Sequence, residues 1–108
     1  MEITKEQIED KVVEMLKTVF DPEIPVNVMD LGMIYKIDVV PNNDLFDINI
    51  EMTFTAPNCP AADFITEDIN QKLSSIKGAG EVNIEVVFEP EWNKDMMSEE
   101  AKLDLGFL

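Results

Sequence analysis

The fold is decided by residues 45–76, which read LFDINIEMTFTAPNCPAADFITEDINQKLSSI. From Leu45 to Thr55 apolar and polar residues alternate, which predicts a strand with one face in the core and one in solvent. After Pro60 the apolar residues recur at spacings of three and four, which predicts a helix with one core-facing stripe. The strand face comprises Phe46, Ile48, Ile50, Met52 and Phe54, and the helix stripe comprises Ala62, Ile65, Ile69, Leu73 and Ile76.

A helix and a strand are predicted before this stretch. Thr4 and Gln7 fit a capping box, so a helix is expected to begin near Thr4. We expect it to carry Val19 on its apolar face and to stop at Asp21-Pro22, because the residue before proline avoids the helical conformation. Gly32 permits a bend before a strand over residues 33–40, and residues 41–44 (PNND) are typical of a turn. The two strands should therefore pair as an antiparallel hairpin.

A strand and a short helix are predicted after it. Glycine near residue 78 suits the end of the second helix, and Val82, Ile84, Val86 and Phe88 then alternate as a third strand. Ser98 should cap a last helix, and the apolar tail residues should pack back onto the domain: Ala101, Leu103, Leu105, Phe107 and Leu108. We expect one α+β domain over residues 1–108, in the order α-β-β-α-β-α, with a three-stranded mixed sheet covered by helices on one face.

The charge of the chain limits its partners. Twenty-three acidic residues against eight basic ones give a net charge of −15. Such a surface repels phosphate backbones and anionic membrane surfaces, so neither nucleic acid nor a membrane is an expected partner. The acids serve solubility, or they steer the protein toward a basic partner.

The sequence also predicts a cytoplasmic location. It contains no run of 18 apolar residues, and the acidic residues near its start leave no room for the apolar core of a secretion signal. Cys59 is the only cysteine, so no disulfide forms within one chain, as suits a reducing compartment. The sequence has no histidine, which removes the commonest acid–base catalyst and metal ligand.

Cys59 is the candidate residue for chemistry. Pro60 suits the first position of a helix, which would place Cys59 at or beside the N-cap. Free N–H groups and the helix dipole favour a thiolate there, while the carboxylates of Asp63 and Glu67 oppose it. Free cysteines are often small buried fillers, but Asn58 and two flanking prolines favour an exposed loop over a core position.

Counting ligands limits the metal hypothesis. Iron–sulfur clusters usually take four protein thiolates, and one chain supplies one. The carboxylates of Asp21, Glu23 and Asp30 are hard ligands that suit such clusters poorly. Any cluster held through Cys59 should therefore be transient or shared, and none should be bound stably by one chain.

Three other groups have two interpretations each. The acids of Asp21-Pro22-Glu23 serve a helix stop and turn, or they form a polar rim beside Cys59 together with Thr53 and Thr55. Trp92 is a packing anchor of the tail or a contact for a partner. Met96 and Met97 are more often core fillers than ligands.

The motifs resemble the SufT/PaaD-like iron–sulfur assembly family. Residues 21–25 (DPEIP) with 30–35 (DLGMIY) look like its opening signature, and residues 53–60 (TFTAPNCP) look like its cysteine loop. Trp92 followed by residues 94–102 (KDMMSEEAK) resembles its closing segment. The three motifs occur in the family's order and span nearly the whole chain.

The resemblance implies a non-catalytic auxiliary factor that helps to make or deliver iron–sulfur clusters. Its expected partners are the assembly machinery, apo-target proteins and a second copy in a homodimer. Functional roles carry over to Cys59 first, then to Asp21 and Glu23, with Thr55 beside them at the cofactor site. The sequence departs from the family pattern at two places, which helps to decide between the branches of the family. Glu91 stands where the family often has a proline, and no cysteine-containing segment follows Leu108. We therefore expect the stand-alone bacterial type.

Other functions remain as alternatives. An adaptor would bind partners through its acidic surface and the Trp92 tail without touching a cluster. An accessory role in a ring-hydroxylating, phenylacetate-type oxygenase system follows from the other branch of the family. A thiol enzyme is disfavoured, because the chain has neither a histidine nor a second cysteine.

Overall fold

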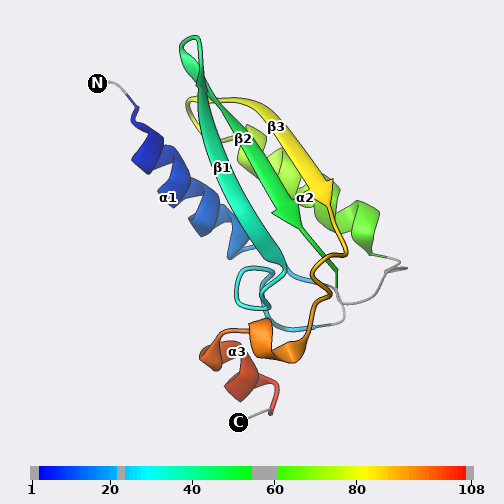
Figure 1. Ribbon diagram of the computed structural model, residues 1–108. Coiled ribbons are helices and arrows are strands. Elements are labelled where there is room, and N and C mark those ends of the chain that lie inside the picture. Colours follow the sequence, from blue (N-terminus) through cyan, green and yellow to red (C-terminus); the bar gives the residue numbers. More distant parts are fainter. Residues whose placement is uncertain (1–2, 22–23, 55–60, 107–108) are drawn as a thin grey trace.

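The elements of the fold follow the predicted order. A computed structural model describes residues 3–21, 24–54 and 61–106. Its helices are α1 (Lys5–Leu16), α2 (Ala62–Ser74) and α3 (Glu99–Asp104), with a short 3-10 helix η1 (Lys94–Met96) before α3 (Figure 1). Its strands are β1 (Ile34–Asn42), β2 (Leu45–Met52) and β3 (Ala79–Val86). The predicted α+β class and three-stranded mixed sheet are confirmed.

The sheet has β2 in the middle. β1 pairs with it antiparallel through a tight turn in which Asn43 takes a positive φ of 58°, while β3 pairs with it parallel. A parallel neighbour requires a crossover, which α2 provides. α1 packs on β1, α2 packs on β3, and the two helices contact each other. Among the helices of the described segments, none has the length and apolarity needed to cross a bilayer.

One face of the sheet forms the core and the other stays polar. Ile48, Ile50, Met52 and Phe54 are buried as their alternation predicts, and they pack with the buried stripe of α2. Ile65, Ile69 and Leu73 in that stripe are fully buried. The opposite face carries polar side chains from all three strands: Lys36, Asp38, Asn49, Glu51, Asn83 and Glu85.

The first helix ends earlier than predicted. Its C-cap is Lys17, not a residue at the Asp21-Pro22 boundary. Val19 is nevertheless buried, because the chain after α1 is held by another segment: Val28 N donates to Val19 O and Phe20 bridges Asn27. Tertiary hydrogen bonds thus end the helix before the proline can.

The second helix begins later than predicted. Its N-cap is Ala61, so the expectation that Pro60 opens the helix with Cys59 beside the cap is wrong. The expected glycine C-cap is also wrong, since α2 ends at Ser74 and its C-cap is Ser75. Gly78, at a φ of +94°, instead turns the chain into β3.

Two strands are shorter than predicted. β2 ends at Met52 rather than Thr55, and β3 ends at Val86. Phe88 therefore lies beyond β3 and is exposed over 45% of its surface. The expected tail packing holds for Ala101 and Leu105.

The remaining tail residues differ. Leu103 is 65% exposed, so its expected packing is wrong. Phe107 and Leu108 lie outside the described residues. The predicted cap of the last helix is confirmed, because the Ser98 hydroxyl accepts from Ala101 N at 3.1 Å.

Candidate functional site

Three backbone hydrogen bonds connect the segment after α1 with the exit of β2. Val28 N donates to Val19 O at 2.9 Å, Met33 N donates to Val28 O at 3.1 Å, and Thr53 N donates to Met33 O at 2.8 Å. Figure 1 shows these segments meeting at the end of the sheet from which α2 departs. The sequence around Asp21 and the sequence leading toward Cys59 therefore share one end of the molecule.

Asp21 lies inside this end of the molecule. Its side chain is 6% exposed, and its backbone carbonyl accepts from Ile24 N at 3.1 Å. Carboxylates are rarely buried this far unless they are paired. Asp21 is therefore part of the buried framework of this end of the fold rather than a residue that only stops a helix.

Thr53 is also buried, with an exposure of 1% and a long 3.5 Å contact from its hydroxyl to Phe54 O. Its side chain therefore does not line an accessible rim, contrary to the expectation from the sequence. The other candidates, Glu23, Thr55 and Cys59, lie outside the described residues. Cys59 falls between Phe54 at the exit of β2 and Ala61 at the start of α2, both of which the structure describes.

The start of α2 has no side-chain cap, because Ala61 offers no hydrogen-bonding group. The first N–H groups of a helix need partners from elsewhere and carry the positive end of its dipole. Asp63 in the first turn is exposed and supplies negative charge there.

A clasp formed by residues 90–98 holds residues 30–35 in place. The indole Nε1 of Trp92 donates to Leu31 O at 2.8 Å, and Tyr35 Oη donates to Pro90 O at 2.7 Å. Ser98 N donates to Asp30 O at 2.8 Å. Sequence reasoning noted both segments as motifs but did not predict that they bind each other.

Gly32 makes the clasp possible. Its φ is +77°, and a Cβ at this position would overlap the backbone carbonyl of Met96. Met96 also places its sulfur 3.5 Å from Tyr35 Oη, while Met97 is buried in the core. Trp92 packs against the core and Met97 lies within it, as the commoner interpretation of each predicted, whereas Met96 is only partly buried and contacts Tyr35.

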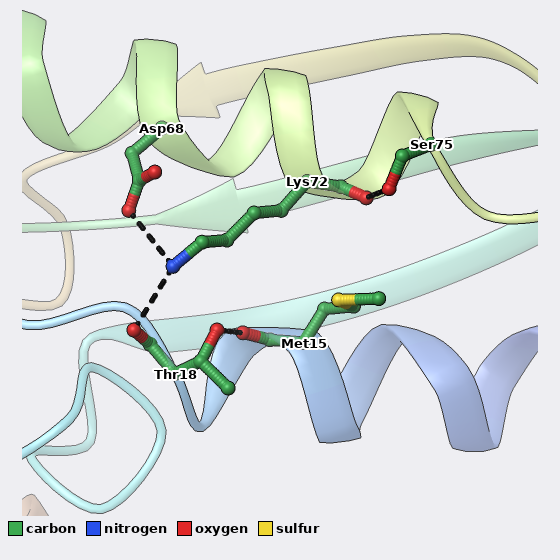
Figure 2. A network of polar contacts seen from close by, with 5 residues as sticks. All are labelled: Met15, Thr18, Asp68, Lys72 and Ser75. Carbon is green, nitrogen blue, oxygen red and sulfur yellow. Dashed lines mark hydrogen bonds and ion pairs between the residues drawn. The ribbon is translucent and has the colours of Figure 1, made fainter.

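Lys72, in the last turn of α2, reaches across to the chain just after α1 (Figure 2). Its Nζ donates to Thr18 O at 3.0 Å and lies 3.2 Å from the Asp68 carboxylate. The Thr18 hydroxyl in turn donates to Met15 O at 2.6 Å. The ammonium group therefore holds the turn between α1 and Asp21 against α2.

The described part of the chain contains no group of three or more histidine, cysteine, aspartate or glutamate residues placed to hold a metal ion. Within residues 3–21, 24–54 and 61–106, a metal site complete in one chain is therefore absent.

Comparison with known proteins identifies the family. Residues 9–86 match the model of the family described as iron–sulfur cluster assembly protein. The chain belongs to this family. The resemblance found in the motifs is thereby confirmed.

Individual relatives agree with this assignment. The chain is 63% identical over 102 residues to a protein of Porphyromonas gingivalis named Fe-S protein maturation auxiliary factor, with 94% of each chain covered. It is 34% identical over 88 residues to the Fe-S protein maturation auxiliary factor SufT of Staphylococcus aureus, covering 82% of this chain and 97% of that one. A domain of unknown function from Bacillus anthracis superposes with a TM-score of 0.85 at 36% identity, covering 95% of both chains.

Proposed function

We propose that this member of the iron–sulfur assembly family is a maturation auxiliary factor that contacts iron or an iron–sulfur cluster through Cys59. Its family membership carries the proposal, together with the presence of one thiol in a chain without histidine. Thiolate sulfur is the ligand that iron–sulfur clusters prefer. The cluster is cargo here rather than a resident cofactor.

The cluster is shared or transient, because one thiolate fills a quarter of the usual ligand set. A homodimer supplies a second Cys59, and small thiols or an apo-target protein supply the rest. Handing over a cluster is easier from a partial ligand set, since the cysteines of the target replace weaker ligands. The partners are thus the assembly machinery and apo-target proteins, in the cytoplasm.

The role is positioning and transfer rather than catalysis of a covalent reaction. The neighbours assigned to Cys59 are Asp21, Glu23 and Thr55. Asp21 is buried at the end of the sheet to which the cysteine loop is attached, so its substitution is expected to disturb the loop. Glu23 and Thr55 supply polar contacts to the loop or to the bound cluster.

Anaerobic reconstitution with iron and sulfide tests this proposal. Wild type, Cys59→Ala and Asp21→Asn are compared by visible absorbance and by native mass. We expect a cluster in wild type, in a dimer, and none in Cys59→Ala. A cluster of equal yield in Cys59→Ala would refute a direct role of the thiol.

The outcome with no cluster in either protein would favour an adaptor that binds partners only. A maturation assay in iron-starved cells then decides between the two roles. In that assay Cys59→Ser abolishes target-enzyme activity if the thiol acts only when a partner adds ligands, and leaves it intact if the chain is a pure adaptor.

A further inference from the structure

The outer edge of β3 is an open sheet edge. β3 pairs only with β2 among the described residues, and no other described segment hydrogen-bonds to its outer side (Figure 1). Val87 N donates inward to Met52 O, so the alternation of a strand directs the N–H and C=O groups of Ile84 and Val86 outward. Unpaired strand edges are templates for another strand.

The two edges of the sheet differ in how they are protected. β1 carries Pro41 and has a register shift between Ile34 and Lys36, and both features hinder edge pairing. β3 contains no proline and no lysine. Val86 and Phe88 are exposed by 36% and 45% along its outer end. This edge therefore offers both backbone groups and apolar surface.

The charges along the β3 edge are of one sign. Residues 78–93 contain Glu81, Glu85, Glu89 and Glu91 and no basic residue. Across the polar face of the sheet, Lys36 stands in register with Glu51, and Glu51 stands in register with Glu85. A cation on a further strand beside Glu85 would give each carboxylate of this row one oppositely charged neighbour.

We propose that the β3 edge binds an extended segment of a partner protein as a fourth strand, and that this segment alternates apolar and basic residues. Its apolar side chains pack beside Val86 and Phe88 on the helix-covered face, and its Lys or Arg side chains lie beside Glu81 and Glu85 on the polar face. The inference deepens the proposed function, on which it rests, by naming the kind of partner segment that an assembly factor of this charge recruits.

A second copy of the chain does not fit this edge. Antiparallel pairing of β3 with its own copy about Asn83 or Glu85, or parallel pairing in register, places an acidic residue of one chain opposite an acidic residue of the other. Like charges directly opposite destabilise a sheet. Each copy also adds a net charge of −15 to the repulsion. We therefore expect a homodimer that shares a cluster to form through another surface.

The first test is an NMR titration of the full chain with a blocked ten-residue peptide that alternates valine and lysine. We expect amide shifts confined to residues 82–88 and slower hydrogen exchange at the outward amides of Ile84 and Val86. A peptide alternating valine and glutamate is the charge-inverted control and should not bind. Shifts centred on β1 or α1, or equal binding of both peptides, would overturn the proposal.

Val86→Pro tests the backbone contacts. The Val86 N–H points outward, so proline there removes an edge donor without removing a bond to β2. We expect the affinity for the valine–lysine peptide to fall by about tenfold or more, as loss of an edge hydrogen bond with added steric blockage implies. Val86→Thr retains the amide and should bind within about threefold of wild type. Circular dichroism checks that both variants fold.

Glu85→Lys tests the charge contacts, and Asp38→Lys is its matched control. Both substitutions reverse one charge on the same polar face, but Asp38 lies on β1 at the far edge. We expect Glu85→Lys to weaken peptide binding several times more than Asp38→Lys. Equal losses would assign the binding to overall charge and overturn the proposal.

Two further measurements distinguish binding at the β3 edge from cluster binding through Cys59 and from self-association of the chain. Cys59→Ala should bind the peptide as wild type does, so a failure of cluster reconstitution leaves this test unaffected. Native mass of wild type and Val86→Pro tests self-association. A wild-type dimer that Val86→Pro dissociates would assign the edge to a second copy and overturn the proposal.

Discussion

The indole Nε1 of Trp92 donates a 2.8 Å hydrogen bond to the backbone carbonyl of Leu31, 61 positions earlier in the chain. Leu31 is buried, so its carbonyl has little access to water. This bond fastens the segment after β3 to the turn that precedes β1. The end of the fold that carries the family's motifs is thus held together by contacts between distant parts of the sequence.

Trp92→Phe should destabilise the protein by about 1–3 kcal/mol, because it leaves the buried Leu31 carbonyl without its donor. Urea unfolding followed by circular dichroism measures the change. Tyr35→Phe is the matched control. It removes the bond to the exposed Pro90 carbonyl, which water can replace, and should cost about 0.5–1.5 kcal/mol. If Trp92→Phe lowered the free energy of unfolding no more than Tyr35→Phe does, the buried Leu31 carbonyl would not need the indole donor, and the prediction would be wrong.

Gly32→Ala should destabilise the protein more than Gly106→Ala. Both glycines have positive φ, +77° and +81°, and an alanine there costs about 1–2 kcal/mol from its conformation alone. Only at Gly32 does the new methyl also overlap the Met96 carbonyl, while Gly106 faces open space. We expect about 1–3 kcal/mol of additional loss at Gly32 from this overlap. Equal thermal shifts in the two variants would rule out the predicted overlap.

Lys72→Met should lower stability by about 1 kcal/mol, since it removes the donor to Thr18 O and the pair with Asp68 from a site only about one-third exposed. Lys11→Met is the control. Lys11 pairs with Glu14 at 3.6 Å on an exposed surface, where such pairs contribute about 0–1 kcal/mol. Differential scanning calorimetry compares the two. If both variants had the same melting temperature, the contacts of Lys72 would contribute no more to stability than an exposed ion pair does.

Thr4→Ala should lower stability by about 1 kcal/mol, because α1 loses the N-cap of a reciprocal capping box. In that box Gln7 N donates to Thr4 Oγ1 at 3.2 Å, and Thr4 N donates to Gln7 Oε1 at 2.9 Å. Thr4→Ser retains the accepting oxygen and should stay close to wild type. Chemical denaturation of the three proteins measures their free energies of unfolding. A loss of stability in Thr4→Ser as large as that in Thr4→Ala would contradict the role of the hydroxyl as a cap.

Much of the fold could be predicted from local pattern. The alternation from Phe46 to Phe54 and the stripe from Ile65 to Leu73 correctly identified the strand and helix that form the core. The capping box at Thr4 and the cap at Ser98 marked helix starts correctly, because a cap is formed by residues only three apart. Such signals depend on near neighbours, so the sequence contains them directly.

The boundaries that failed depend on distant partners. α1 stops at Leu16 because Val19 and Phe20 pair with residues 27 and 28. The sequence of α1 itself contains no signal of that pairing, because its partners lie outside the helix. Phe88 lies outside the strand because the last backbone hydrogen bond to β2 in this region is donated by Val87, the residue that follows β3. Likewise, alternation placed Thr53 on the polar face, but Thr53 is buried and its N–H donates to the carbonyl of Met33, twenty positions earlier.

The sequence by itself determined the composition of the candidate site and the family of the protein. One cysteine, no histidine and an excess of acids restrict the chemistry whatever the fold, because ligand types and net charge do not depend on conformation. Only the tertiary structure decided that Asp21 is buried, that residues 90–98 hold residues 30–35, and that β2 is the central strand with β1 and β3 at the two edges of the sheet. These features arise from contacts between residues far apart in the chain, and such contacts form only when the core brings those residues together.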